Sequence, residues 1–160
     1  MLIAIASHWP ETSGIVFDLP AVAKRAAEAV EGAGLTDRVR TIGGSFLKPL
    51  PKELSQCDVF YLKFILHDWD DAVCHTILAN IVAIAKPGAK VVTTDFILEV
   101  DGANMEMSKR LMDINMMASN PAGARERTWP HYRGLFEKAG LKGTSLIKMR
   151  DLVSTVEATV

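Results

Sequence analysis

The segment Phe60–Asp71, with the sequence FYLKFILHDWDD, joins an apolar run to a polar turn that holds one histidine, one tryptophan and three aspartates. Residues 58–62 are rich in aromatic and branched side chains, which predicts a buried strand. Apolar residues then recur at the spacing of one helical face, at Val73, Ile77, Ile81 and Ala85. The polar residues are therefore expected on a short turn between a strand and a helix.

Three residues, His67, Asp68 and Trp69, fall on this turn. Asp70 or Asp71 suits the N-cap of the following helix, because a carboxylate there accepts free backbone N–H groups. In open α/β sheets, ligands bind in the crevice at the carboxyl ends of the strands. The turn is therefore a candidate for the functional site.

The rest of the chain alternates between predicted strands and helices. Strands are expected at 14–18, 38–42 and 90–98, helices at 1–8, 21–30, 104–117 and 129–139, and a C-terminal hairpin at 143–149 and 151–159. This alternation predicts an α/β fold with a mostly parallel sheet that helices cover on both faces.

The composition is that of a globular protein. Of 160 residues, 49% are hydrophobic and 23% are charged, and the net charge is -1, which argues against a nucleic-acid partner. No apolar run approaches the length of a membrane span. Cys57 and Cys74 form no CxxC pair and no zinc spacing, so we expect reduced, buried thiols, no metal site and a cytoplasmic protein.

His67 has two interpretations. An imidazole at a strand end can act as a general base near neutral pH, provided that an acceptor holds its other ring nitrogen. Asp95, at a strand end, and Glu126, in a loop, are candidate acceptors. The alternative is a polar residue in a connecting turn. Asp70 and Asp71 are interpreted as helix N-terminal carboxylates, which the helix dipole favours.

Other polar and sulfur-containing residues also leave alternatives. Asp18 closes a strand, where a carboxylate can accept hydrogen bonds from ribose hydroxyls or cap the helix that begins at Pro20. Five methionines fit either flexible core packing or the wall of an apolar pocket: Met105, Met107, Met112, Met116 and Met117. The sequence contains no P-loop, nucleophile elbow or HExxH motif.

Four segments occur in the order seen in a known family: Gly14–Pro20, Gly44–Leu47, Leu62–Asp71 and Arg125–Thr128. Over nearly its whole length the chain resembles the C-terminal catalytic domain of S-adenosylmethionine-dependent O-methyltransferases, a family that includes plant caffeic acid O-methyltransferases and bacterial and fungal small-molecule enzymes. The resemblance implies a Rossmann-like class I methyltransferase sheet with a C-terminal antiparallel hairpin.

The resemblance also implies roles for individual residues. His67 matches the general base that takes the proton from a substrate hydroxyl. Glu126 and Asp95 match two glutamates that orient this histidine, with Asp95 one methylene shorter. Met116 and Asn120 match positions that line the acceptor pocket.

Five further positions are implied to contact the cofactor, S-adenosylmethionine. Asp18 matches the carboxylate on the ribose, Phe46 and Trp69 match residues that flank the adenine, and Lys63 matches a cofactor-contacting lysine. Ser45 stands where the family usually has an aspartate.

The same resemblance predicts that residues 1–160 form one incomplete catalytic domain. The family's first strand, its glycine-rich cofactor loop and its N-terminal dimerisation domain would precede Met1. That strand normally separates the strands at 14–18 and 57–62, so these two are expected to pair directly, to receive a strand from a partner chain, or to form a marginal fragment. The expected partner is a second copy in a homodimer or a chain that supplies the missing strand.

Two functions follow as hypotheses. The first is an O-methyltransferase that acts on a small, hydroxylated, aromatic acceptor, with no nucleic-acid or membrane partner. The alternative is a truncated, inactive homologue that persists as a fragment or as a binding or interaction module. A nucleotide-binding Rossmann domain of another class is disfavoured, because no phosphate loop is present.

Overall fold

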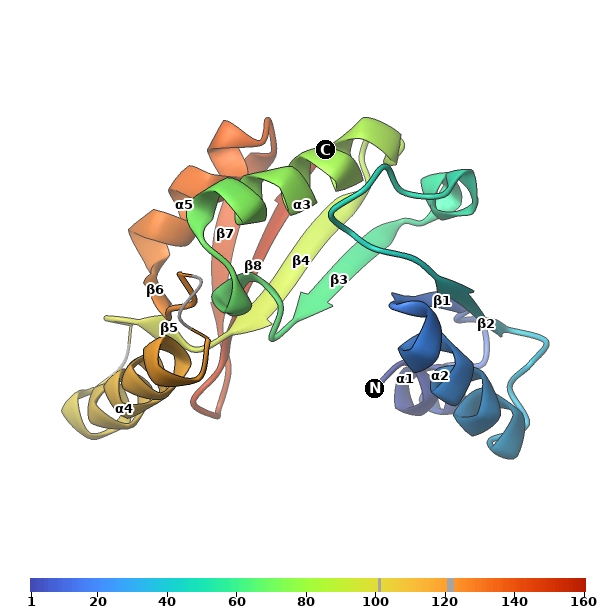
Figure 1. Cartoon of the computed structure of the whole chain (residues 1–160), viewed down its shortest axis with the longest axis horizontal. Coiled ribbons are helices and arrows are strands. Elements are labelled where there is room, and N and C mark those ends of the chain that lie inside the picture. Colours follow the sequence, from blue (N-terminus) through green and yellow to red (C-terminus); the bar gives the residue numbers. More distant parts are fainter. Residues whose placement is uncertain (101, 121–122) are drawn as a thin grey trace. The chain divides into compact units, whose positions relative to one another are not determined.

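A computed structural model describes residues 1–100, 102–120 and 123–160 of the chain. The chain divides into two compact units, Met1–Leu54 and Ser55–Val160. Figure 1 shows the elements of both units. A short 3₁₀ helix, η1, spans Lys52–Gln56.

The first unit packs two helices and two strands around a small apolar core. Helix α1 spans Leu2–His8, β1 spans Gly14–Asp18, α2 spans Pro20–Gly32 and β2 spans Val39–Gly43. Strands β1 and β2 are parallel, with Asp18 opposite Gly43 at their carboxyl ends. The buried core consists of Ala6, Val30, Leu35 and Val39.

The second unit contains a four-stranded sheet in the order β3-β4-β8-β7. Its strands span Val59–Lys63 (β3), Lys90–Asp95 (β4), Lys142–Lys148 (β7) and Ser154–Thr159 (β8). Strands β3 and β4 are parallel, whereas β8 is antiparallel to both β4 and β7. The mixed α/β class and the C-terminal antiparallel hairpin are thus confirmed.

Two helices of this unit pack against each other. Helix α3 (Asp71–Ile84) contacts α5 (Trp129–Lys138), and α5 also contacts β7 and β8. Figure 1 shows α3 and α5 on the same face of the sheet. Apolar residues at helical spacing fix α3 there, because Ile77, Leu78 and Ile81 are all buried.

The predicted single strand over 90–98 is wrong in one respect. Strand β4 ends at Asp95, and Ile97–Leu98 forms a separate strand, β5, which pairs in parallel with β6 (Arg127–Thr128). The physical reason is that the backbone of 97–98 forms its ladder with a later segment of the chain. This ladder brings residues 126–128 close to the carboxyl end of β4.

The remaining helix, α4, spans Ala103–Ser119 and extends beyond both ends of the predicted range 104–117. Strands β1 and β2 form a sheet of their own in the first unit, and β3 belongs to the four-stranded sheet of the second unit. Neither cysteine forms a disulfide, and Cys74 is buried, whereas Cys57 is only half-buried. Among the described helices, none is long and apolar enough to cross a membrane.

Candidate active site

The carboxyl ends of β3 and β4 place the predicted base and its candidate partners near one another. The two strands are parallel, with Lys63 opposite Thr94, so the turn after β3 starts beside the end of β4. That turn contains a 3₁₀ helix, η2 (Leu66–Asp68), and ends at Asp70. Asp70 is the N-cap of α3, since its carboxylate accepts the N–H of Val73 at 2.8 Å.

His67 makes a buried hydrogen bond with Glu126. The distance from His67 Nδ1 to Glu126 Oε1 is 2.9 Å, and both side chains are buried. An ionised carboxylate only accepts hydrogen bonds, so this contact places the proton of a neutral imidazole on Nδ1. Nε2 then carries the lone pair, and its distance to Asp68 Oδ1 is 3.7 Å.

The charges around the imidazole raise its proton affinity. Burial acts to lower the pKa of His67, but the hydrogen bond and charge of Glu126 outweigh it, with smaller contributions from Asp95 and Asp68, and the pKa of His67 is raised. Burial also raises the pKa of Glu126, against the effect of its hydrogen bond with His67. The pair therefore forms a base that is stronger than an isolated histidine.

Asp95 lies at the end of β4 but hydrogen-bonds to other residues. It is fully buried, and its Oδ2 accepts the hydroxyls of Thr93 at 2.8 Å and Tyr132 at 2.9 Å. Within the described ranges, Asp95 Oδ1 and Glu126 Oε2 are buried without a hydrogen-bond partner. Burial raises the pKa of Asp95. Asp95 acts on His67 through its charge, whereas Glu126 acts through both its charge and a hydrogen bond.

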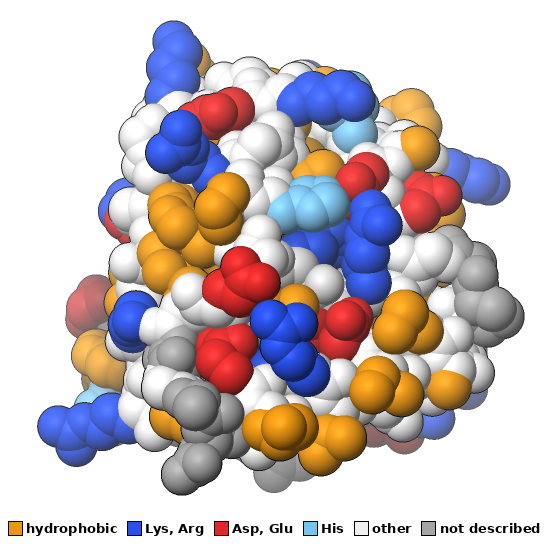
Figure 2. Space-filling view, turned by 90° about the vertical axis from the view of Figure 1, so that its left-hand side faces the viewer, with side chains coloured by type: hydrophobic (Ala, Val, Ile, Leu, Met, Phe, Trp, Pro, Cys, Tyr) orange, Lys and Arg blue, Asp and Glu red, His pale blue; other side chains and the backbone are white. Residues whose placement is uncertain are grey.

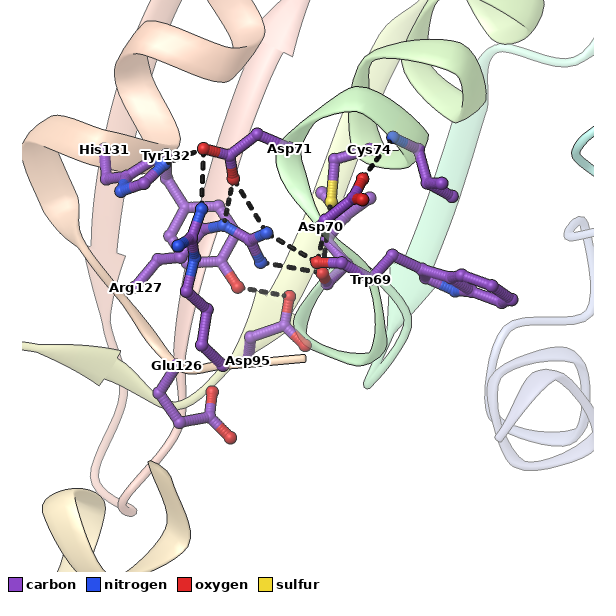
Figure 3. A network of polar contacts seen from close by, with 12 residues as sticks. Trp69, Asp70, Asp71, Cys74, Asp95, Glu126, Arg127, His131 and Tyr132 are labelled. Atoms are coloured by element: carbon purple, nitrogen blue, oxygen red, sulfur yellow. Dashed lines mark hydrogen bonds and ion pairs between the residues drawn. The ribbon is translucent and has the colours of Figure 1, made fainter. Parts of the chain in front are cut away.

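Asp71 is the centre of a network that the sequence did not predict (Figure 3). Its Oδ2 lies 2.7 Å from Arg125 Nη2 and 2.9 Å from His131 Nε2, and its Oδ1 lies 2.9 Å from Arg127 Nη2. Figure 2 shows charged and histidine side chains gathered beside one another on one face of the molecule. Asp71 thus does more than complement the helix dipole.

The predicted acceptor-pocket residues both belong to α4 or to its end. The Met116 side chain is buried. Asn120 Nδ2 donates to the carbonyl oxygen of Asp68 at 2.8 Å, which ties the end of α4 to the His67 turn. The structure therefore brings His67, Glu126 and Asn120 together around one turn.

Two predicted cofactor residues, Lys63 and Trp69, flank the same turn. Lys63 ends β3, and its ammonium lies 5.2 Å from the centre of the Phe64 ring. The Trp69 indole points away from the Asp71 network (Figure 3). The Phe64 ring in turn stacks on the His67 imidazole, with 5.5 Å between the ring centres.

The other cofactor candidates, Asp18, Ser45 and Phe46, belong to the first unit, at and after the carboxyl ends of β1 and β2. Asp18 Oδ1 accepts the N–H of Leu19 at 2.7 Å, and α2 has no side-chain cap, so the capping alternative for Asp18 is not realised. Ser45 Oγ accepts the N–H of Leu47 at 3.3 Å.

The backbone of this segment runs close to β1. A Cβ atom added to Gly44 would lie 2.5 Å from a ring carbon of Phe17, so only glycine fits there without a shift. A carboxylate and an aromatic ring beyond parallel strand ends are groups that suit a ribose diol and an adenine. The residues present therefore fit the nucleoside part of S-adenosylmethionine.

Sequence reasoning missed several buried polar partners, chiefly Arg127 and Tyr132. Both are fully buried despite their polar groups. One signal for the ion-pair network was available: an Asp-Asp pair at a predicted helix start and an Arg-x-Arg segment later in the chain carry opposite charges.

The histidine–carboxylate pair lies at the carboxyl ends of parallel strands, where open α/β sheets bind their ligands. Comparison with known proteins gives the family. The model of the O-methyltransferase domain family matches residues 1–142, and the chain belongs to this family.

Curated relatives agree with this assignment. The chain is 34% identical over 158 residues to the phenazine O-methyltransferase PhzM of Lysobacter antibioticus, a match that covers 99% of this chain and 44% of the relative. It is 34% identical over 141 residues to caffeic acid 3-O-methyltransferase 1 of Populus tremuloides, covering 87% of this chain and 35% of the relative. The chain thus spans less than half the length of these relatives.

Solved structures agree as well. The crystal structure of LaPhzM matches with a TM-score of 0.88 and 31% identity, over 99% of this chain and 46% of that chain. The O-methyltransferase NcsB1 from neocarzinostatin biosynthesis, in complex with S-adenosylmethionine and 2-hydroxy-5-methyl naphthoic acid, matches with a TM-score of 0.85 and 28% identity, over 99% of this chain and 45% of that chain. The predicted family is therefore confirmed, and S-adenosylmethionine is confirmed as the cofactor of this family.

Proposed function

We propose that this chain carries the catalytic region of an S-adenosylmethionine-dependent O-methyltransferase that methylates a hydroxyl group of a small aromatic molecule, with His67 as the general base. The observation that carries the proposal is the buried 2.9 Å hydrogen bond between His67 Nδ1 and Glu126 Oε1, in a chain of the O-methyltransferase family. This bond leaves Nε2 as the nitrogen that accepts a proton.

The pair suits deprotonation of a phenolic hydroxyl. A phenol has an ordinary pKa of about 10, so a base with a raised pKa removes its proton more readily than an isolated histidine does. His67 Nε2 takes the proton as the acceptor oxygen becomes nucleophilic, and the Glu126 carboxylate stabilises the imidazolium that forms. The charge of Asp95 acts in the same direction.

In the first unit, the proposed cofactor residues are Asp18, which would accept the ribose hydroxyls, and Phe46 and Ser45. In the second unit, the proposed cofactor residues are Lys63 and Trp69. When bound, S-adenosylmethionine supplies a methyl group on a sulfonium, which is already a good electrophile. The remaining task of the protein is to align the acceptor oxygen and remove its proton.

An aromatic acceptor is supported by the relatives and by α4. PhzM is named for phenazine and NcsB1 was solved with a naphthoic acid. Met116, a polarisable and adaptable side chain, is buried one helical turn before Asn120, whose amide is anchored to the Asp68 carbonyl oxygen. We assign both residues to the acceptor side of the site.

The first test is calorimetric titration of the purified chain with S-adenosylhomocysteine, with circular dichroism to confirm folding. Micromolar binding is expected, followed by transfer of a labelled methyl group to members of a panel of hydroxylated aromatic compounds. A folded chain that binds S-adenosylhomocysteine but methylates none of them would contradict the acceptor class.

A folded chain that does not bind S-adenosylhomocysteine would favour the alternative, an inactive homologue that acts as an interaction module. Light scattering on the same sample reports whether the chain forms a homodimer. Cytoplasmic localisation likewise stays a prediction.

A further inference from the structure

Arg127 is a buried cation whose contacts surround the base. Only 1% of its surface is exposed. Its Nη1 donates to the carbonyl oxygen of Leu66 at 2.8 Å, and its Nη2 donates to the carbonyl oxygen of Trp69 at 2.6 Å. These two carbonyl groups lie on either side of His67 in the chain. One planar guanidinium therefore fixes the backbone before and after the base.

The turn that carries His67 needs such support. Helix η2 contains only three residues, Leu66–Asp68, and a single 3₁₀ turn has poor hydrogen-bond geometry of its own. Its closing hydrogen bond, from the N–H of Trp69 to the carbonyl oxygen of Leu66, is long at 3.4 Å. The guanidinium supplies shorter hydrogen bonds to the same segment.

Consecutive residues of the 125–127 segment contact consecutive parts of this turn. The backbone N–H of Arg125 donates to the carbonyl oxygen of His67 at 2.9 Å. The Glu126 carboxylate holds the ring nitrogen Nδ1, and the Arg127 side chain holds the flanking carbonyl groups. Position, ring orientation and tautomer of the histidine are thus fixed by one short segment.

Asp71 fixes the orientation of the guanidinium. Its Oδ1 accepts from Arg127 Nε at 3.0 Å and from Arg127 Nη2 at 2.9 Å (Figure 3). Its Oδ2 is shared by Arg125 and His131. Partial burial acts to raise the pKa of Asp71, but these hydrogen bonds outweigh it and hold the pKa well below its usual range, so Asp71 stays ionised.

We infer that Arg127, oriented by Asp71, is a positioning residue for the base: it fixes the turn so that His67 Nε2 faces the acceptor hydroxyl while Nδ1 faces Glu126. This inference depends on the proposed function in one respect: the group that His67 Nε2 faces is the acceptor hydroxyl of that function. The position of the ring is a property of the folded chain, and it can be measured without turnover.

The experiment compares Arg127→Lys with the wild-type chain and with Arg133→Lys, a matched control on the exposed side of α5, where Arg133 pairs with Glu137 at 3.1 Å. Lysine keeps the charge but cannot form the planar fork that reaches both carbonyl groups. The two readouts are the ¹⁵N chemical shifts of the His67 ring, at a pH where it is neutral, and the steady-state kinetics of methyl transfer.

For Arg127→Lys we expect a mixture of the two ring tautomers instead of the Nδ1–H form alone, and a loss in kcat of about tenfold or more with an unchanged KM for the cofactor. Arg133→Lys is expected to match the wild-type chain in both readouts. If folded Arg127→Lys keeps one tautomer and full kcat, the positioning role is overturned.

Two further outcomes also decide the matter. If Arg127→Lys does not fold, the same two readouts are measured for Asp71→Asn. That variant removes the carboxylate that orients the guanidinium and leaves the charge of Arg127 in place. If the wild-type chain transfers no methyl group, the proposed function fails, but a tautomer mixture found only in Arg127→Lys or Asp71→Asn still supports the positioning role. A single tautomer in those variants refutes it.

Discussion

The carboxyl ends of β1–β2 and of β3–β4 both carry predicted site residues, but they hold them in different ways. At the end of β3–β4, His67 and Glu126 are buried and bonded to each other. At the end of β1–β2, Asp18 is only half-buried, and its described hydrogen bond is with the neighbouring backbone N–H of Leu19.

The difference matches the two roles proposed for these residues, general base for His67 and ribose binding for Asp18. A base must be held in one orientation before substrate arrives, so the protein itself satisfies its second nitrogen. A carboxylate that binds a ribose must keep its acceptor capacity for the ligand, so few protein donors should occupy it. Substitutions of His67 and of the side chains that hold it should therefore affect the rate of transfer, and substitutions at the end of β1–β2 should affect cofactor affinity.

The largest expected effect is that of His67→Ala. Removal of the base should lower kcat by about 10²–10⁴-fold, while affinity for S-adenosylhomocysteine stays nearly unchanged. Transfer kinetics and calorimetry on the same folded variant check both values. His75→Gln, which changes a histidine of α3, serves as the control. A parallel loss of rate and affinity would contradict the division between the two regions.

Next come the two carboxylates near the base. Glu126→Gln removes the charge that raises the pKa of His67, so kcat should fall by about 10–100-fold. The wild-type rate should rise with pH through a midpoint above the ordinary histidine value of 6.5, because only the neutral ring accepts a proton. In Glu126→Gln that midpoint should move to lower pH.

Asp95→Asn is the matched comparison for this change. Burial disfavours the charge of Asp95, and an asparagine oxygen can still accept from Thr93 and Tyr132. We therefore expect a smaller loss of kcat than in Glu126→Gln, together with a small shift of the midpoint in the same direction. Equal losses of kcat in Asp95→Asn and Glu126→Gln would mean that Asp95 also orients the His67 ring directly.

The contrast between these carboxylates marks the limit of sequence reasoning. The sequence pattern placed Asp95 at a strand end and Glu126 in a loop, and both locations are correct. Hydrophobic periodicity describes the faces of local elements, whereas the partner of a buried carboxylate depends on the packing of distant segments. Asp95 was expected to hold His67, but its Oδ2 accepts the hydroxyls of Thr93 and of Tyr132, on α5, instead.

Asp71 shows the same limit, because its location was predicted but its partners were not. Its position at a helix start was predicted, and it is the first residue of α3. Its partner Arg127 is separated from it by 56 residues. The break between β4 and β5 was also missed, because Ile97–Leu98 is as apolar as a continuing strand would be and pairs with a segment much later in the chain.

Besides its expected effect on the position of His67, Asp71→Asn should have a smaller effect on stability. Because the pKa of Asp71 is lowered on folding, its ionised form stabilises the fold above the ordinary value of 3.8, and this contribution is lost as the pH falls toward the folded pKa. At pH 7, and allowing for the partial exposure of the side chain, the variant should lose about 1–2 kcal/mol of unfolding free energy.

Urea unfolding followed by circular dichroism at several pH values checks this prediction. The difference between the wild-type chain and Asp71→Asn should be nearly constant near neutral pH and should shrink below pH 3.8. Asp37→Asn, at an exposed position, is the control for loss of one negative charge. A difference that grows on acidification would contradict the ion-pair network.

The smallest expected effect lies at β1–β2, where Ser45→Asp restores the carboxylate that the family usually has. The new side chain can accept the N–H of Leu47 as Ser45 Oγ does, and its second oxygen is available for a donor on the adenine. Affinity for S-adenosylhomocysteine should rise by about threefold, the size of one modest hydrogen bond, with kcat unchanged. Ser45→Asn, of similar size but uncharged, separates the effect of charge from that of shape. If calorimetry finds no gain in folded Ser45→Asp, the segment after β2 does not contact the adenine. The end of β1–β2 would then not determine cofactor affinity.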